Sequence, residues 1–119
     1  MADCLFCRIV AGDVPSTEVR STDRVYAFRD IAPHAPTHVL VVPREHHTDA
    51  VTLAASDPGL LAELVTVGEQ VATDEGIADS GYRLVFNLGP DSGQTVLHTH
   101  LHVLGGTWLA GMAGGPMPG

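Results

Sequence analysis

Residues 96 to 104 constrain the fold of this chain more than any other stretch, because their side chains alternate with a period of two. In a β-strand, residues two positions apart share a face, so His98, His100 and His102 would lie side by side. The opposite face would carry the packing residues, which are Leu97, Thr99, Leu101 and Val103. We therefore predict a β-strand over residues 96 to 104, with one packed face and one face of three imidazoles.

The spacing of the three histidines limits what they can bind together. At about 3.3 Å of rise per residue, neighbours on one face are roughly 6.6 Å apart and the outer pair roughly 13 Å. Two adjacent rings could share a zinc ion at the usual Zn–N distance of about 2.0–2.1 Å, but all three could hardly do so along a straight strand. At least one histidine is left for other chemistry.

A histidine in this setting suits attack on phosphorus. Neutral imidazole is a good nucleophile near pH 7, since its unperturbed pKa is about 6.5. The glycine-rich turn over residues 89 to 93, with Thr95 and a second imidazole, could hold phosphate oxygens. No pair of carboxylates stands near the triad, which argues against two-metal hydrolysis. A metallohydrolase with two triad histidines on zinc, or a nucleotide-binding regulatory module with little turnover, are the alternatives.

The composition bounds the possible partners. The 119 residues, with a formal net charge of -8, are enough for one domain. Clustered Lys and Arg are needed to bind nucleic acid or an anionic membrane, so we expect neither as a partner. No stretch approaches the roughly 20 apolar residues of a membrane span, and no signal-peptide pattern opens the sequence. We therefore expect a cytoplasmic location.

Local signals predict an α+β fold with a meander-like antiparallel sheet of about five strands, one long helix and a short N-terminal helix. Residues 56 to 58, Ser-Asp-Pro, begin a helix well, and apolar residues then follow at helical spacing up to Gly76. Two prolines exclude a strand between residues 30 and 36. The other predicted elements are a helix or turn over residues 5 to 11 and strands over 19 to 21, 25 to 28, 38 to 42 and 82 to 87.

Cys4 and Cys7 are the only cysteines, and they form a Cys-x-x-Cys pattern. A structural disulfide is not expected in a reducing compartment. A redox-active pair would normally begin a helix after a strand, and no strand precedes this one. Half of a zinc site, completed by distant histidines, is the favoured interpretation, and two buried thiols without a ligand are the alternative.

The segment His98-Thr99-His100-Leu101-His102-Val103-Leu104 resembles the signature of the histidine triad (HIT) superfamily. The resemblance continues through Cys4-Leu5-Phe6-Cys7-Arg8-Ile9, Phe28-Arg29-Asp30-Ile31-Ala32-Pro33, the stretch from Ala35 to His46, Asn87, and Gly93-Gln94-Thr95. The Leu104-Gly105-Gly106 ending is most similar to the Hint branch of nucleoside phosphoramidate hydrolases, rather than to the Fhit-like dinucleoside polyphosphate hydrolases. The resemblance implies a HIT-like fold, a single HIT domain over residues 1–106 and a homodimer. The composition of residues 107–119 indicates a Gly/Pro-rich tail, which departs from the family pattern.

The resemblance also implies a mechanism. His100 would attack the α-phosphorus of a purine nucleoside phosphoramidate, such as adenosine 5'-monophosphoramidate, and water would hydrolyse the nucleotidyl-histidine. His102 would hydrogen bond the phosphate, and Thr95, where many relatives have serine, would lie near the leaving group. Hydrolysis of dinucleoside polyphosphates stays open as an alternative reaction.

Substrate-binding residues carry over from the resemblance in the same way. Asp30 would bind the ribose hydroxyls, and Asn87 would contact the phosphate or the ribose. Gly93 and Gln94 would donate to the phosphate. The purine would enter an apolar slot, unless its residues are simply part of the core; these residues are Phe6, Ile9, Phe28 and Ile31.

Some relatives with this cysteine pattern hold a structural zinc, and the matching ligands here are Cys4, Cys7, His46 and His98. Two thiolates and two imidazoles suit tetrahedral zinc with no open position. Without metal, His46 and His98 would join the proton-relay network of zinc-free relatives. The resemblance implies no organic cofactor, and it assigns a structural hydrogen bond to His38.

Overall fold

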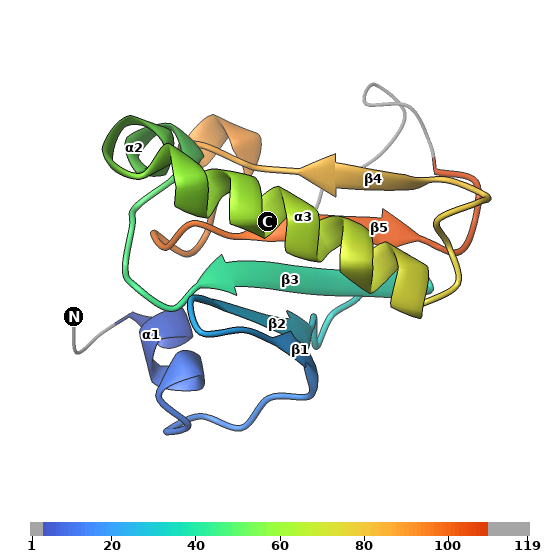
Figure 1. The fold of residues 1–119 in the computed structure, drawn as a ribbon, viewed down its shortest axis with the longest axis horizontal. Coiled ribbons are helices and arrows are strands. Elements are labelled where there is room, and N and C mark those ends of the chain that lie inside the picture. The colour runs from blue at the N-terminus through green and yellow to red at the C-terminus, as the bar shows by residue number, and fades with distance from the viewer. Residues whose placement is uncertain (1–3, 110–119) are drawn as a thin grey trace.

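The computed structural model describes residues 4–109, which form one antiparallel five-stranded sheet with helices packed against it (Figure 1). The strands are β1 (Glu18–Ser21), β2 (Val25–Arg29), β3 (Thr37–Pro43), β4 (Tyr82–Val85) and β5 (Leu101–Gly105). The helices are α1 (Leu5–Val10), α2 (Ala50–Ser56), α3 (Pro58–Asp74) and the short 3-10 helix η1 (Pro90–Ser92). The predicted α+β fold, with one long helix and a short N-terminal helix, is confirmed.

The strand order is β1-β2-β3-β5-β4, so β5 lies between β3 and β4. The prediction of a meander is wrong on this point, because a meander would pair β3 with β4. The connection through α2 and α3 carries the chain past the place of β5 to the edge of the sheet, and β5 then fills the gap (Figure 1). All five residues of β5 are buried as a result.

The helix α3 covers one face of the sheet (Figure 1). It begins as predicted, because Pro58 takes the first position and the Asp57 carboxylate accepts the Leu60 N–H at 3.1 Å. Its buried residues include Leu60, Leu64, Val67 and Val71. They pack on inward-facing strand residues, which include Val39, Val41, Leu101 and Val103. The helix α2 was not predicted; its cap is Asp49, which accepts the Thr52 N–H at 2.9 Å.

The opposite face of the sheet meets α1. The residues packed there are Phe6, Ile9, Phe28, Leu40 and Val42. The rings of Phe6 and Phe28 touch edge to face, with centroids 5.6 Å apart. Leu40 is also the cross-strand partner of His102. His102 therefore lies on the α1 side of the sheet, because residues directly opposite each other on paired strands point to the same face.

The histidine strand is shorter than predicted. β5 begins at Leu101, and residues 96 to 100 are irregular. Pro43 has no N–H with which to extend the ladder, and its carbonyl accepts the His98 Nε2–H at 2.8 Å. The Thr99 N–H donates to the loop after β3, and Leu97 is 63% exposed instead of packed. His98 and His100 thus precede the strand, where each ring finds a different partner.

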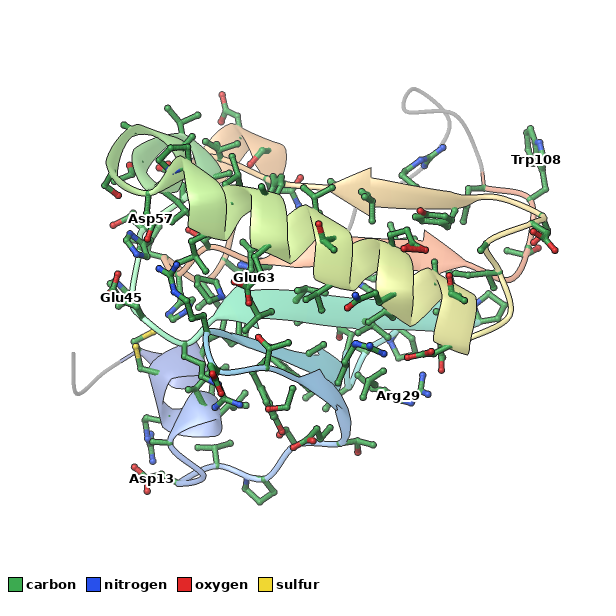
Figure 2. All side chains as sticks on the ribbon, in the orientation of Figure 1. Asp13, Arg29, Glu45, Asp57, Glu63 and Trp108 are labelled. Atoms are coloured by element: carbon green, nitrogen blue, oxygen red, sulfur yellow. The ribbon has the colours of Figure 1, made fainter. Side chains whose placement is uncertain are left out.

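The end of the described chain leaves the sheet at residue 106. Trp108 is 87% exposed and projects from the molecule (Figure 2). Residues 110–119 of the predicted Gly/Pro-rich tail lie outside the described residues. No helix within residues 4–109 is both long and apolar enough to cross a membrane.

Candidate functional site

Four histidines from two parts of the chain are buried: His38 in β3, His102 in β5, and His98 and His100 just before β5. Each is at most 5% exposed. Buried polar side chains need hydrogen-bond partners, and the partner of a ring nitrogen determines whether that nitrogen carries a proton. The protonation of these rings can therefore be derived from what they face.

His100 has a fixed tautomer. Its Nδ1 lies 2.7 Å from the main-chain carbonyl oxygen of His98. A carbonyl oxygen can only accept, so Nδ1 carries a proton, and in the neutral form of the ring the lone pair is on Nε2. Phe6 packs edge to face on the imidazole, with ring centroids 5.0 Å apart. The ring is therefore held in one orientation, with Nε2 as the nitrogen that can act as a nucleophile.

A chain of hydrogen bonds sets the opposite tautomer in His102. The main-chain N–H of His34 donates to His38 Nδ1 at 3.0 Å, so the proton of neutral His38 is on Nε2. That Nε2 lies 2.9 Å from His102 Nδ1 and 3.4 Å from an Asp30 carboxylate oxygen. Burial lowers the pKa of His38, although the Asp30 charge acts to raise it, and the neutral form is favoured. His38 therefore donates to His102, which carries its own proton on Nε2.

Both imidazoles line a cleft of about 260 Å³. The lining residues are Phe6, Asp30, Ala32, His34, Leu40, Thr95, His100 and His102. A carboxylate, a hydroxyl and two imidazoles with opposite tautomers thus meet against an apolar wall. Convergent polar groups on an apolar wall are typical of small-molecule sites.

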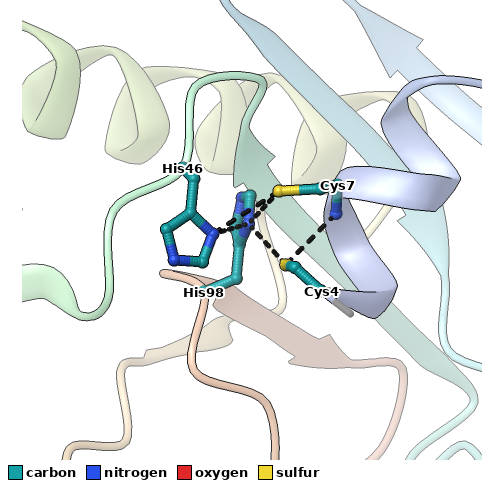
Figure 3. Close-up of side chains that lie close together, drawn as sticks. All are labelled: Cys4, Cys7, His46 and His98. Atoms are coloured by element: carbon teal, nitrogen blue, oxygen red, sulfur yellow. Dashed lines mark hydrogen bonds between the residues drawn. The ribbon is translucent and has the colours of Figure 1, made fainter. Parts of the chain in front are cut away.

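A second cluster joins α1 to His46 and His98 (Figure 3). His98 donates Nε2–H to the Pro43 carbonyl, so its Nδ1 carries the lone pair. This Nδ1 lies 3.3 Å from Cys4 Sγ, 3.5 Å from Cys7 Sγ and 3.2 Å from His46 Nδ1. His46 Nδ1 is 3.4 Å from Cys7 Sγ.

The four ligand atoms fit a tetrahedral zinc ion. With Zn–N of about 2.0–2.1 Å and Zn–S of about 2.3 Å, tetrahedral geometry separates two nitrogens by about 3.3 Å and nitrogen from sulfur by about 3.6 Å. Burial lowers the pKa of His98 to about 4, so the ring is neutral at pH 7. Burial and the hydrogen bond with Cys4 raise the pKa of Cys7, so a cation is needed to hold Cys7 as a thiolate.

The HIT domain family model matches residues 11–108 of this chain. The chain belongs to the HIT family. Purine nucleoside phosphoramidase from Escherichia coli (strain K12) is 40% identical to this HIT protein over 110 residues, which are 92% of each chain. An uncharacterized HIT-like protein from Synechococcus elongatus is 41% identical over 108 residues, which are 91% of this chain and 94% of that protein.

Solved HIT structures share the fold. A HIT family hydrolase from Clostridium thermocellum has a TM-score of 0.89 at 40% identity, over 93% of this chain and 96% of that chain. A HIT family hydrolase from Legionella pneumophila has a TM-score of 0.89 at 42% identity, over 94% of this chain and 100% of that chain. The predicted HIT membership and HIT-like fold are therefore confirmed.

The four residues expected to form a purine slot in this HIT domain differ in exposure. Phe6 lines the cleft, whereas Ile9 and Phe28 pack behind it in the core. Ile31 is 99% exposed, in the loop that follows Asp30. Phe6 thus belongs to both the core and the cleft, and Ile31 offers apolar surface that the protein itself does not cover.

Three predicted phosphate ligands of the HIT pattern have other surroundings here. Asn87 lines a separate cleft of about 600 Å³ along β4. The N–H groups of Gly93 and Gln94 donate within their own turn, to the carbonyls of Pro90 and Gly89. Their roles at a phosphate stay predictions, and the turn would have to exchange these internal bonds for bonds to the ligand.

Sequence reasoning assigned no cleft role to Leu40 in β3 or to His34 in the loop before it. Leu40 lines the cleft, and His34 lines it while orienting His38. The alternation along β3 could have indicated Leu40. Val39 and Val41 pack on α3, so His38 and Leu40, at the alternate positions, point to the opposite face of the sheet.

Proposed function

We propose that this protein is a purine nucleotide hydrolase that cleaves nucleoside phosphoramidates at the α-phosphorus, through a nucleotidyl intermediate on His100. One observation carries the proposal: His100, with Nδ1 on the His98 carbonyl, and His102, with Nδ1 on the His38 ring, line one cleft, so that Nε2 is the nitrogen of each ring that would act on the substrate. The 40% identity to Escherichia coli purine nucleoside phosphoramidase and the similarity to two HIT family hydrolases support this reaction class.

In this mechanism, His100 Nε2 attacks the α-phosphorus and the P–N bond to the amine breaks. The amine leaves with the electron pair of that bond and with a proton, which we assign to the hydroxyl of Thr95. Thr95 regains its proton from the water molecule that attacks in the second step. The His102 Nε2–H donates to a phosphate oxygen and stabilises the charge that develops there. Water then attacks the phosphorus, the bond to His100 breaks, and the nucleotide leaves.

The nucleoside would be held by Asp30 and by apolar residues. One Asp30 oxygen accepts the Ala32 N–H at 2.8 Å, which holds the carboxylate at the cleft where a ribose diol can donate to it. We assign the purine to the wall made by Phe6, with the exposed Ile31 closing over it. Ile9 and Phe28 would support Phe6 from the core.

We propose that Cys4, Cys7, His46 and His98 hold one structural zinc ion. When bound, the metal supplies a cross-link, since four protein ligands leave no open position for substrate or water. The cross-link would join α1, the loop after β3 and the segment that leads to His100. The reaction needs no organic cofactor.

A homodimer and a cytoplasmic location complete the proposal. β4 is an edge strand, and the cleft along it is lined partly by Leu84, Val85 and Phe86. A second copy could cover this edge and its apolar side chains. The cytoplasmic location follows from thiolate ligands, which persist in a reducing compartment.

Replacement of the nucleophile tests the proposed reaction. We expect His100→Ala to lower hydrolysis of adenosine 5'-monophosphoramidate by more than about 10³-fold, while AMP still binds in a calorimetric titration. Mass spectrometry of wild-type protein quenched with substrate should find an adenylyl group on His100.

Four other outcomes would change the proposal. Unchanged turnover in His100→Ala, or an adduct on another residue, would exclude this nucleophile. Hydrolysis of a diadenosine polyphosphate without hydrolysis of the phosphoramidate would select the alternative reaction. Binding of AMP by wild-type protein without turnover of either compound would indicate a regulatory module.

A further inference from the structure

Thr99 lies between His98 and His100, and the mechanism above gives it no role. The sequence predicted it among the packing residues of a strand, and it is buried, at 1% exposed. It precedes β5, however, so the strand ladder does not hold its main chain. Both of its donors bond one oxygen, the main-chain carbonyl of His47, with the N–H at 2.6 Å and the Oγ1 hydroxyl at 2.9 Å.

The N–H of Thr99 and the carbonyl of His98 belong to the same peptide unit. This peptide is trans, so its N–H and its C=O point in opposite directions. With the N–H directed at the His47 carbonyl, the C=O is directed away from it, and its oxygen accepts the Nδ1–H of His100 at 2.7 Å. The hydrogen bonds therefore form one chain from His100 through this peptide to His47. Bonds arranged in a chain polarise and strengthen one another.

The opposite orientation of this peptide would give His100 the wrong tautomer. If the peptide flipped, the His98 carbonyl would face the His47 carbonyl, and two acceptors would meet. The Thr99 N–H would then face His100 Nδ1, which would have to accept, so the ring proton would move to Nε2. A nitrogen that carries a proton has no lone pair with which to attack phosphorus. The bonds to His47 therefore disfavour an arrangement that would disable the nucleophile.

The hydroxyl of Thr99 adds a second connection to the same loop. A carbonyl oxygen has two lone pairs, so it can accept from the N–H and from the hydroxyl together. A threonine side chain is stiff at χ1 because it is branched at Cβ, so a bonded hydroxyl also restrains the main chain that carries it. His47 takes part only through its carbonyl, since its ring bonds the Glu45 carboxylate at 2.7 Å.

We propose that Thr99 is a positioning residue for the nucleophile. Its N–H and its hydroxyl hold the peptide unit in the one orientation in which the His98 carbonyl keeps the proton of His100 on Nδ1. This inference rests on the proposed function, in which His100 Nε2 attacks phosphorus. Thr99 does not line the cleft, so it acts through His100 and not on the substrate.

Thr99→Val tests the hydroxyl, since valine has the shape of threonine without the donor. In full-length protein we expect kcat for adenosine 5'-monophosphoramidate to fall about 2- to 12-fold, as for net loss of one hydrogen bond, with a smaller change in KM. Nitrogen chemical shifts of His100, measured by NMR at about pH 8 where an ordinary histidine is neutral, should show the Nδ1–H form in wild-type protein and a mixture of tautomers in the variant. Thr99→Ser keeps the donor and should match wild-type protein in both measurements.

Thr66→Val is the matched control, because the Thr66 hydroxyl also donates to a main-chain carbonyl, that of Ala62 at 3.0 Å in α3. It should leave kcat and the His100 shifts unchanged. The inference is overturned if Thr99→Val keeps the wild-type tautomer, if Thr99→Ser loses as much activity as Thr99→Val, or if the control does. Each of these results leaves the proposed function in place. Wild-type protein that does not hydrolyse the phosphoramidate would overturn the proposed function and this inference with it.

Discussion

Two clusters of side chains in this HIT domain have the composition of metal sites but differ in their hydrogen bonds. The cysteine cluster consists of Cys4, Cys7, His46 and His98, and the relay cluster consists of Asp30, His38 and His102. In each cluster the ligand atoms lie within 4.8 Å of one another. In the cysteine cluster, the second nitrogen of His98 faces the Pro43 carbonyl. In the relay cluster, the second nitrogen of His38 faces the His34 N–H.

The main-chain partner decides what each cluster can bind. A metal-bound histidine normally donates its other ring N–H to an acceptor, and His98 has such an acceptor. In His38 the second nitrogen, Nδ1, accepts a hydrogen bond and so carries no proton. A metal ion on Nε2 would displace the remaining ring proton, and the ring would then carry neither proton. The cysteine cluster is therefore suited to zinc, and the relay cluster to a chain of hydrogen bonds that orients His102. Close ligand atoms alone do not distinguish a metal site from a hydrogen-bond chain.

Metal content should give the largest difference between the two clusters. We expect protein purified from zinc-containing medium to carry one zinc ion per chain by elemental analysis, and Cys4→Ser/Cys7→Ser to carry none. The melting temperature of that double variant should be lower by about 10 °C or more, because structural zinc contributes directly to folding stability.

The relay cluster provides the matched control for metal content. Asp30→Asn/His38→Asn removes two of its three potential ligands, and it should keep the full zinc content of the wild-type protein. Two zinc ions per wild-type chain, or zinc lost from this control variant, would remove the distinction between the clusters.

Removal of the relay donor should give an intermediate effect, on catalysis. His38→Ala leaves His102 Nδ1 without the ring that donates to it, so we expect kcat to fall about 5- to 150-fold, as for loss of one buried hydrogen-bond partner. KM should change less, because His38 acts by positioning His102. Nitrogen chemical shifts measured by NMR should show the Nε2–H form of His102 in wild-type protein and a mixture of tautomers in the variant.

His47→Ala is the control for the relay variant. The His47 ring bonds Glu45 at 2.7 Å, outside both clusters, and the variant should keep kcat within about twofold of wild type. An equal loss of activity in both variants would mean that His38 supports the fold and has no particular role in orienting His102.

The smallest expected effect is on the pH dependence of stability. Burial lowers the pKa of His38 from 6.5 in the folded protein. Below about pH 6.5 the unfolded chain therefore binds more protons than the folded protein, and the free energy of unfolding decreases as the pH falls toward the folded-state pKa. Denaturant titrations of zinc-loaded protein from about pH 7 to about pH 5 should show this decrease. His38→Asn should show a smaller slope, and equal slopes would contradict a buried neutral His38.

Local rules were enough for most elements of the fold. The hairpin of β1 and β2, the strand β3 and the start of α3 at Asp57 and Pro58 agree with the predictions. The prediction of a strand over residues 96 to 100 was wrong, because Pro43, which is distant in sequence, ends the hydrogen-bond ladder between β3 and β5. The strand order was wrong because pairing of β5 with β3 depends on where the α3 connection leaves space, which no local pattern contains.

The candidate site was likewise predicted in part, and the residues that were missed depend on contacts between elements. The cysteine pattern and the HIT resemblance predicted Cys4, Cys7, His46 and His98 as one set, and the structure brings these four together. The cleft residues Leu40 and His34 were missed, because a cleft is formed by packing between elements. Asn87 was expected near the phosphate, and it lines the cleft along β4.

The sequence by itself determined which chemical groups are available: three histidines at alternate positions, a Cys-x-x-Cys pair, and membership of the HIT family. Only the tertiary structure decided which ring nitrogen carries the proton in His98 and in His102. The reason is that the deciding partners come from other elements: the Pro43 carbonyl is 55 residues from His98, and the His38 ring is 64 residues from His102. A side chain brings its two ring nitrogens, but the fold supplies the donors and acceptors that distinguish them.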